Sequence, residues 1–433
     1  MQSEQVHGEQ NILDGEKETM IMENKLFTRD FTLVVIGQII SLFGNAAVRF
    51  ALPLYLLNQT GSSALYGTVM ALSFIPAVLL SPVGGLIADR VNKRNIMVIL
   101  DLSTAGLILL FMLLMNHVSL VLLLTVTLMI LYGIAGAYQP AVQASVPALM
   151  AQDKIMSANA VINVIASFAS LLGPVFGGIL YSAYGLIPVL VVGTVSFAVS
   201  ALMEIFIRIP YQKREVKGGI VRVACGDIRE SAHFICREKP VIGQGLLVIC
   251  GINLFLSSMI IVGLPYLITE VFPFEAAQAN RLYGYAQGAL AAGGIVGGIG
   301  AGVLAERLQI KKAGNLLIMG AACVLPMGFA LLCMDNSMAV YMTITLCCFV
   351  IMIISTIFTV QIMSFMQAET PQELVGKVIA LAMTGSMCAQ PFGNALYGFL
   401  FELFAGYEAG VVLFAGVISL VIAVAARKLF RKL

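Results

Sequence analysis

Charged residues are scarce in this chain. Asp, Glu, Lys and Arg make up 11% of the 433 residues, whereas hydrophobic residues make up 59%. A typical soluble domain has about 25% charged and about 45–50% apolar residues. The composition therefore excludes a single soluble globular domain, and the lack of a heptad or Gly-X-Y period excludes coiled coils and collagen. The length instead accommodates about twelve membrane spans of ~20 residues each.

Motifs for nucleotide binding or hydrolysis are also missing. The chain has no Gly-x-x-x-x-Gly-Lys-Ser/Thr loop, no Gly-x-Ser-x-Gly elbow and no His-Glu-x-x-His pair. We therefore expect no enzyme activity and no cofactor, with a membrane-embedded enzyme and a non-transporting sensor as minor alternatives. Cys225, His233 and Cys236 lack a fourth zinc ligand, and the eight cysteines show no disulfide framework. We expect no metal site.

Apolar runs bounded by glycine, proline, asparagine and charged residues define twelve candidate spans. They lie near residues 31–57, 64–88, 95–116, 119–140, 157–182, 186–209, 241–270, 281–305, 314–334, 338–362, 375–402 and 408–427. Residues 1–30 hold seven acids and three bases without the pattern of a secretory signal. The predicted organisation is a polar cytoplasmic tail (1–30), a six-helix half (31–209), a cytoplasmic linker (210–240) and a second six-helix half with a short basic tail (241–433).

Lys and Arg are distributed asymmetrically over the predicted loops. With twelve spans, 23 of the 25 fall on one side of the membrane, Arg281 lies on the other side, and Arg49 lies inside a span. Cytoplasmic loops of membrane proteins are enriched in Lys and Arg. We therefore predict a multi-pass protein of the plasma membrane with both termini in the cytoplasm.

The sequence repeats itself at half its length. GLIADRVNKR, which starts at Gly85, is matched 217 residues later by GVLAERLQIK, which starts at Gly302, and the same shift carries Pro174 onto Pro391. Two anchors at one shift indicate two homologous six-span halves. Repeats of this kind place a substrate site between the halves near the midplane, and access alternates as one half rocks against the other.

These features resemble the major facilitator superfamily and, within it, the bacterial drug and macrolide efflux branch. Gly85 to Arg94 fits the superfamily signature between spans 2 and 3, except that Asn92 stands where glycine is usual. AVQASVPALMAQDKIMSANA, RIP and TPQELVGKVIA are similar to the efflux branch. The resemblance implies an all-α integral membrane fold with twelve transmembrane helices in two pseudo-symmetric halves. It also implies an antiporter that exports amphipathic or hydrophobic small molecules in exchange for protons. We expect no nucleic-acid partner; the sequence does not determine the oligomeric state, for which a monomer is the expectation.

Charged residues at the cytoplasmic ends of spans 2 and 8 form a candidate latch. A carboxylate at a helix end can bridge to bases and to a neighbouring helix N-terminus, and the bridge breaks when the halves move. The candidate residues are Gly85, Asp89, Arg90, Lys93, Arg94, Asp101, Gly302, Glu306, Arg307 and Lys311. The alternative is that they anchor the loops and set the topology.

Span 5 contains ASLLGPVFGG, which is similar to a motif of the superfamily's antiporters except that Ala169 replaces its first glycine. Its glycines allow close helix approach and its proline allows a bend. The motif residues are Gly173, Pro174, Gly177 and Gly178, with Pro391 at the equivalent place in span 11. The resemblance favours export over uptake, and plain helix packing is the alternative.

Polar residues along apolar spans predict a central cavity. Ser41, Asn45 and Arg49 recur every four residues and share one helix face. An Arg at mid-span costs at least about 2.5–3.5 kcal/mol, so Arg49 should face water, an acid or an anionic substrate unless it snorkels outward. The candidate cavity residues are Ser41, Asn45, Arg49, Tyr132, Gln139, Asn163, Asn253, Ser257, Ser355, Gln361 and Gln390. Interhelical hydrogen bonding is the alternative for each. Arg49 also motivates a second function, a carrier of an anionic metabolite or lysolipid.

Few acids are placed to carry a coupling proton. Asp101, Glu204, Glu270 and Glu402 all lie near predicted span ends, which favours structural roles. None of the three histidines lies at mid-membrane, so a histidine relay is not expected. Proton coupling is therefore implied by the resemblance, and the sequence itself does not locate the titrating carboxylate.

Overall fold

The computed structural model describes residues 27–209, 229–304, 310–371 and 374–431, with the backbone alone at residues 81–90, Asp153 and Cys236. The described residues form helices joined by short turns, and no strand occurs among them. The helices of the first half are α2 (Arg29–Thr60), α3 (Ser63–Arg90), α4 (Lys93–Leu114), α5 (Leu120–Leu149), α6 (Ile155–Tyr184) and α7 (Leu186–Ile205).

The second half contains eight long or medium helices in its described part. They are α9 (Pro240–Ile252), α10 (Ser258–Tyr266), α11 (Ala276–Val303), α12 (Ala313–Ala322), α13 (Val324–Cys333), α14 (Ser337–Glu369), α15 (Val375–Leu403) and α16 (Glu408–Phe430). Wider π-helical turns at Asn253–Ser257 and Leu267–Val271 extend α9 and α10 into one stretch, Pro240–Val271.

Eleven helical stretches of the described chain are long and apolar enough to cross a membrane. α15, which carries Lys377, Gln390 and Asn394, is not one of the eleven, yet it runs for 29 residues beside them. Large apolar side chains such as Leu113 and Val303 are exposed on the outside of the helices and require lipid as their surroundings. The all-helical membrane fold is thereby confirmed, and the exact number of spans stays a prediction.

Helix ends follow from local sequence signals. Thr28 accepts a hydrogen bond from the backbone N–H of Phe31 (3.3 Å) and caps α2. The side chain of Asn92 accepts from the backbone N–H of Arg94 (3.0 Å) and caps α4. Asn92 has a φ of −58°. The position where the superfamily signature usually has glycine therefore needs no left-handed backbone here, and asparagine supplies a helix cap instead.

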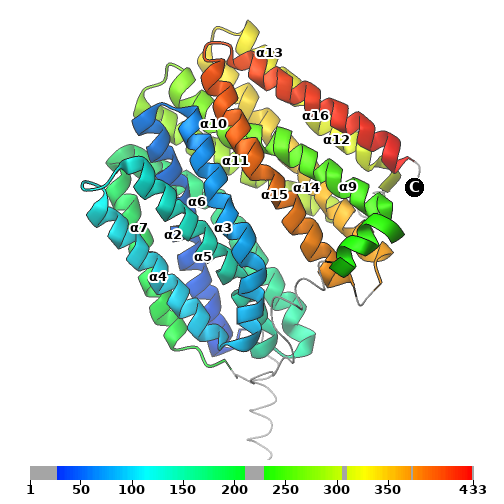
Figure 1. Ribbon diagram of the computed structural model, residues 1–433. Coiled ribbons are helices and arrows are strands. Elements are labelled where there is room, and N and C mark those ends of the chain that lie inside the picture. The colour runs from blue at the N-terminus through cyan, green and yellow to red at the C-terminus, as the bar shows by residue number, and fades with distance from the viewer. Residues whose placement is uncertain (1–26, 210–228, 305–309, 372–373, 432–433) are drawn as a thin grey trace, which may run out of the picture.

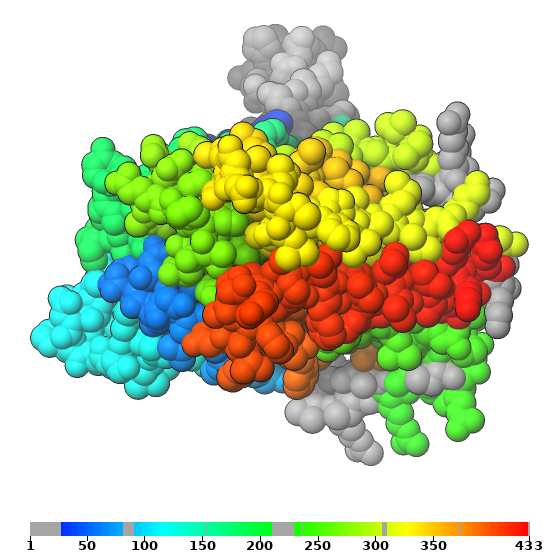
Figure 2. All heavy atoms as spheres, turned by 90° about the horizontal axis from the view of Figure 1, so that it is seen from above, coloured from blue at the N-terminus to red at the C-terminus, as the bar shows by residue number. Residues whose placement is uncertain are grey.

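The helices form two bundles. α2–α7 pack together, as do α9–α16, and Figure 1 shows the blue-to-green bundle beside the green-to-red one. From above, the cyan and blue helices occupy one side of the molecule and the yellow and red helices the other (Figure 2). Across the boundary, α3 packs against α15 and α6 against α11. In the order of spans α3 corresponds to α11 and α6 to α15, so the two contacts are equivalent under the repeat.

Glycines bring the two bundles into backbone contact. A Cβ added to Gly67 of α3 would meet the carbonyl oxygen of Asn394 and lie 2.8 Å from the Cα of Gly398 in α15. A Cβ on Gly178 of α6 would lie 3.1 Å from the Cα of Gly284 in α11. Small residues permit such close approach between membrane helices. In Figure 1, α3 and α15 lie together toward the top and diverge toward the bottom.

Candidate transport cavity

A cavity of about 440 Å³ lies between the two bundles. Side chains of α2, α3, α5 and α6 form one wall, and Ile261, Tyr283 and Gln287 of the second bundle form the other. The ring of Phe50 stacks on that of Tyr283 across the boundary, with 4.9 Å between ring centroids. The Gln287 amide donates a hydrogen bond to the Tyr283 hydroxyl (2.8 Å). This central cavity therefore borders both halves.

Two further cavities adjoin the central one. A cavity of about 820 Å³ on the side of the second bundle shares Ile261 and Gln287 with it. A cavity of about 250 Å³ inside the first bundle shares Leu42, Asn45 and Arg49 with it. The three cavities form an adjoining series that leads from the interior of the first half, across the boundary, into the second half.

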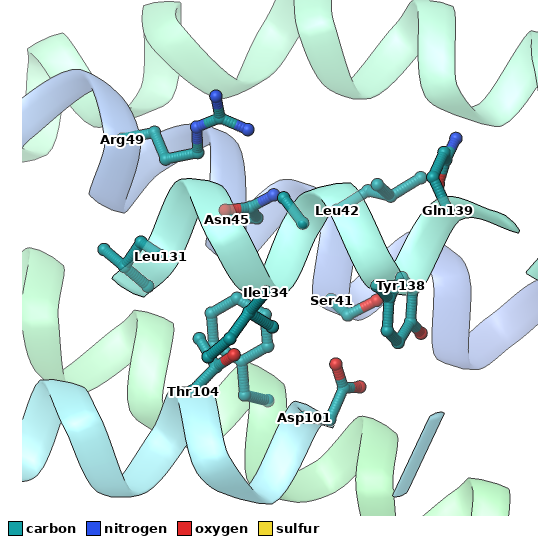
Figure 3. A pocket seen from close by; sticks show the side chains of 12 residues that line it. Ser41, Leu42, Asn45, Arg49, Asp101, Thr104, Leu131, Ile134, Tyr138 and Gln139 are labelled. Atoms are coloured by element: carbon teal, nitrogen blue, oxygen red, sulfur yellow. The ribbon is translucent and has the colours of Figure 1, made fainter. Parts of the chain in front are cut away.

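Arg49 stands where the small cavity meets the central one. Its guanidinium carbon lies 3.6 Å from the centroid of the Tyr132 ring, a cation–π contact. No carboxylate among the described side chains lies within ion-pair distance of Arg49. Ser41 and Asn45 line the same small cavity from the same helix, as Figure 3 shows. The predicted polar face of this helix thus points into the first bundle.

Two carboxyl groups are buried beside the small cavity. Asp101 of α4 is 2% exposed and lines the cavity, and Glu204 of α7 is fully buried. Tyr138 of α5 donates from its hydroxyl to Oε1 of Glu204 (2.8 Å), and Nε2 of Gln38 donates to the Tyr138 hydroxyl (2.6 Å). Figure 3 shows Asp101 next to Tyr138 and Ser41. Glu204 is the last residue but one of α7 and Asp101 lies in the first half of α4, as the sequence predicted, and the structure buries both side chains within the first bundle.

Hydrogen bonds between the bundles gather at the end of the molecule where α2 ends and α3 begins. Nδ2 of Asn58 donates to Oδ1 of Asn280 in α11 (2.9 Å), and the Ser63 hydroxyl donates to the Gly398 carbonyl in α15 (3.0 Å). Together with the glycine contacts, these bonds close the molecule at this end. We call this contact region the α2–α3 closure.

Glu402 of α15 adds a helix-terminal contact to the closure. Its Oε2 accepts hydrogen bonds from the Ser62 hydroxyl (2.8 Å) and from the backbone N–H of Ala64 (3.1 Å). A carboxylate satisfies free N–H groups at a helix N-terminus and interacts favourably with the helix dipole. The second half thereby caps the first turn of α3 in the first half.

Most predicted cavity residues line the three cavities. The eight that do are Ser41, Asn45, Arg49, Tyr132, Gln139, Ser257, Ser355 and Gln390. Asn163 is exposed, and Gln361 is buried away from these cavities. The Asn253 amide donates to the Ser386 carbonyl (3.0 Å) and so links its span to α15. These last three residues line none of the three cavities.

The span 5 motif is a packing surface in the structure. A Cβ on Gly173 would meet the Cβ of Ala46 in α2, and one on Gly177 would lie 3.1 Å from the Cα of Ala47. Pro174 lies inside α6 and lines the central cavity. Pro391 lies inside α15 at the equivalent position.

The candidate latch is only partly described. The side chains of Asp89 and Arg90, and all of Glu306 and Arg307, lie outside the described residues, while the Gly85 backbone is part of α3. Gly302 and Lys311 are exposed, and Lys93 is half-buried. Nη1 of Arg94 donates to the Ile205 carbonyl (3.4 Å), a contact inside the first half. The latch stays a prediction.

Sequence reasoning did not single out several residues of this region. Gln38, Tyr138, Tyr283 and Gln287 are all part of the cavity walls or of the buried acid cluster. One signal was present for Tyr138, because it directly precedes Gln139, a predicted cavity residue. No comparable signal marks Tyr283, whose role depends on the fold that brings it against Phe50.

An all-helical membrane protein with two repeat-related bundles and a cavity between them is a transporter in architecture. The family model of the Major Facilitator Superfamily matches residues 34–389, and the chain belongs to that superfamily of transporters. The crystal structure of the nucleoside transporter NupG superposes on the chain with a TM-score of 0.72 at 14% sequence identity. The match covers 93% of this chain and 100% of that one. At this identity the likeness concerns the fold.

Curated relatives include efflux proteins. The chain is 23% identical over 181 residues to macrolide efflux protein A of Streptococcus pyogenes, covering 42% of this chain and 45% of that protein. It is 30% identical over 190 residues to multidrug resistance protein MdtG of Enterobacter lignolyticus, covering 42% of this chain and 44% of that protein. The chain thus spans about half the length of the curated relatives it matches.

Proposed function

We propose that the chain is a secondary active exporter of amphipathic or hydrophobic small molecules, driven by protons and operating by alternating access. The observation that carries the proposal is the adjoining series of cavities between two repeat-related bundles that are held together at one end. Rocking one such bundle against the other moves the opening of a fixed midplane site from one side to the other.

The chemistry of the cavity walls supports an amphipathic substrate. The cavity of about 820 Å³ is lined by apolar side chains such as Leu290 and Ile351 and by several serine, threonine and glutamine side chains, among them Gln287. Apolar pockets with a few polar groups bind drug-sized ligands through shape and a small number of hydrogen bonds. The names of the two efflux relatives point to the same class of substrate.

The charge distribution supports an orientation with both termini in the cytoplasm of a bacterial-type plasma membrane. In this orientation the α2–α3 closure faces outward. The conformation is then inward-facing, so the cavities receive substrate from the cytoplasm. Opening of the closure would release it outside, which is the direction required for export.

Efflux assays in a bacterial strain that lacks its major efflux pumps test the proposal. We expect cells that express the chain to extrude fluorescent amphipathic dyes or a radiolabelled macrolide, and a protonophore to abolish the extrusion. Asp335→Asn, in an exposed loop, serves as an expression-matched control. Accumulation equal to that of the empty vector, with the protein present in the membrane, would contradict drug export.

A second candidate function rests on Arg49. Its guanidinium lines two cavities and has no described carboxylate partner, so it is available to an anionic group such as that of a metabolite or lysolipid. Arg49→Gln should then abolish binding of the anion to purified protein and leave export of neutral dyes intact. Equal loss of both activities would argue against an anion-specific role.

The cytoplasmic latch is part of the same proposal. Asp89 and its repeat counterpart Glu306 would hold the cytoplasmic ends together in the outward-facing state, when the α2–α3 closure is open. Asp89→Asn should therefore lower efflux at unchanged surface expression. Undiminished efflux in this variant would leave these residues with the role of loop anchors.

A further inference from the structure

Two carboxyl groups are deeply buried in the described part of the first half, one of which, Asp101, is a predicted member of the latch. Asp101 and Glu204 lie on different helices, α4 and α7, and are 2% and 0% exposed. Met97, one turn before Asp101, and Ile207, three residues after Glu204, belong with Phe31 to a fully buried apolar cluster that borders the pair on one side. A carboxylate in such surroundings is strongly disfavoured unless it is neutralised or fully hydrogen-bonded.

One oxygen of each carboxyl group is left without a hydrogen bond. The Tyr138 hydroxyl accepts from Gln38 and donates to Oε1 of Glu204, which uses its single proton. Oε2 of Glu204 and Oδ2 of Asp101 are buried without any hydrogen-bond partner. Buried polar atoms in native proteins are nearly always paired. Both unpaired atoms belong to carboxyl groups, and binding of a proton would turn such a group into a donor.

Among the described side chains, no base forms an ion pair with either carboxyl group. Asp101 of α4 and Glu204 of α7 both lie beside Tyr138 of α5, the third titratable group of the cluster. From α2 the cluster receives the neutral Gln38 and Ser41. Arg49, also on α2, lines the same cavity but stacks on Tyr132 and forms no ion pair with Asp101. Two buried carboxyl groups that share a neighbour and have no paired base among the described side chains do not both stay ionised.

Water in the cavities can reach Asp101. Asp101 lines the small cavity together with Asn45 and Gln139, and this cavity adjoins the central one at Arg49. The small cavity, at about 250 Å³, has room for several water molecules, each of which occupies about 30 Å³ in the liquid. Polar groups on its wall supply the partners that such waters need.

We propose that Asp101 and Glu204 form the proton-binding pair of this transporter, in which Tyr138 positions Glu204 and Asp101 exchanges the proton with water in the cavity. Uptake transfers a proton from hydronium in the cavity to the Asp101 carboxylate, which yields a neutral carboxylic acid and water. Release is the reverse step after the cavity has changed sides. The inference rests on the proposed proton-coupled function and gives it a residue-level site.

Infrared difference spectroscopy of the purified full-length protein in liposomes, recorded between low and high pH, tests the pair. The experiment does not require the substrate to be known. A protonated carboxyl group has a C=O stretching band that an ionised carboxylate lacks, and the band shifts in heavy water. We expect the wild type to show such a band, Glu204→Gln or Asp101→Asn to remove or displace it, and the double variant to abolish it. Asp335→Asn, in an exposed loop, should leave it unchanged.

Tyr138→Phe keeps the pair testable if the acid variants fail to fold. It keeps the ring and both carboxyl groups and removes only the hydroxyl that donates to Glu204, so the band should shift in frequency and persist. A band that is identical in wild type, Tyr138→Phe and the folded acid variants would overturn the pair.

The outcomes for the pair and for the proposed function are separable. Protonophore-sensitive efflux that survives in both single acid variants would overturn the pair and leave proton coupling in place. Loss of the band in the acid variants, combined with wild-type efflux that ignores the protonophore, would support the pair as a proton site and overturn coupling as the energy source.

Discussion

The two halves share their helix order and differ in what they bury. α4 and α5 begin at Lys93 and Leu120, and their counterparts in the second half begin 217 residues later, at Ile310 and Ser337. By this shift the second half has Ile318 where the first has Asp101, and Ser355 where the first has Tyr138.

The same contrast holds for the last helix of each half. α7 begins at Leu186 and α16 begins 222 residues later at Glu408, so by helix starts Glu204 corresponds to Ala426, and by the shift of 217 it corresponds to Val421; both are apolar. Asp101, Tyr138 and Glu204 therefore each correspond to a neutral or apolar residue in the second half. The features common to both halves are the close helix contacts, whereas the buried carboxyl groups of the described chain lie in the first half and the largest of the three cavities adjoins the second. The two halves thus share the way in which their helices pack, whereas their buried polar and charged side chains differ.

The largest effect on efflux should come from neutralising the two buried carboxyl groups of the first half. In the double variant Asp101→Asn/Glu204→Gln, the first half becomes as neutral as the second, and we expect loss of all protonophore-sensitive efflux because no proton site remains. Efflux assays at matched membrane expression measure this. Ser355→Ala, which removes a polar group from the cavity on the side of the second half, is the comparison variant and should alter apparent substrate affinity while sensitivity to the protonophore persists.

A similar loss should follow when one half can no longer approach the other. A Cβ on Gly398 would lie 2.7 Å from the carbonyl oxygen of Ser63 and 3.0 Å from the Cα of Gly67, and overpacking of this kind costs about 1–3 kcal/mol. Gly398→Leu should therefore depopulate the closed state. Spin labels at Leu65 and Leu403, in a background without native cysteines, should report a longer distance across the closure.

The control for this change is a glycine with free space around it. A Cβ on Gly410 would meet no atom within 4 Å, so Gly410→Leu should leave the label distance unchanged. Equal distances in wild type and Gly398→Leu would show that the glycine contact does not hold the closure.

A smaller effect is expected at Tyr132, because its contact with Arg49 lies within the first half. Tyr132→Leu removes the aromatic face under Arg49, a contact of about 0.5–2 kcal/mol. The freed guanidinium should change the apparent substrate affinity several-fold. Tyr132→Phe keeps the ring face and should behave like wild type in the same transport assay. If both variants behave alike, the cation–π contact does not position Arg49.

The smallest effect should come from Glu402, which caps α3 from the other half. Loss of a helix cap costs about 1 kcal/mol, so Glu402→Gln should speed hydrogen exchange in the first turn of α3 by several-fold. Glu275 stands before α11, the repeat counterpart of α3, and its side chain makes no cap hydrogen bond. Glu275→Gln should leave exchange in both helices unchanged. Equal rates for Glu402→Gln and wild type would contradict the role of this cap.

Much of the architecture was accessible from the sequence, because apolar runs and a repeated motif report directly on helices and on their order. The polar face of α2 was also predictable, since residues four apart share one side of a helix. Asn253 shows the limit, because the pattern marks a polar residue but does not reveal that Ser386 is its partner. The burial of Glu204 was missed because Ile207, beyond the end of α7, stays fully buried and extends the apolar interior past the helix end.

The α2–α3 closure also determines how gradually the protein can open. Its contacts are backbone-to-backbone approaches at Gly67 and Gly178 and short hydrogen bonds, and all of these lose most of their energy within the first ångström of separation. Because the two contact pairs are related by the repeat, one rotation separates both together. Intermediate openings would therefore be sparsely populated, and transport would proceed by all-or-none jumps between two stable arrangements.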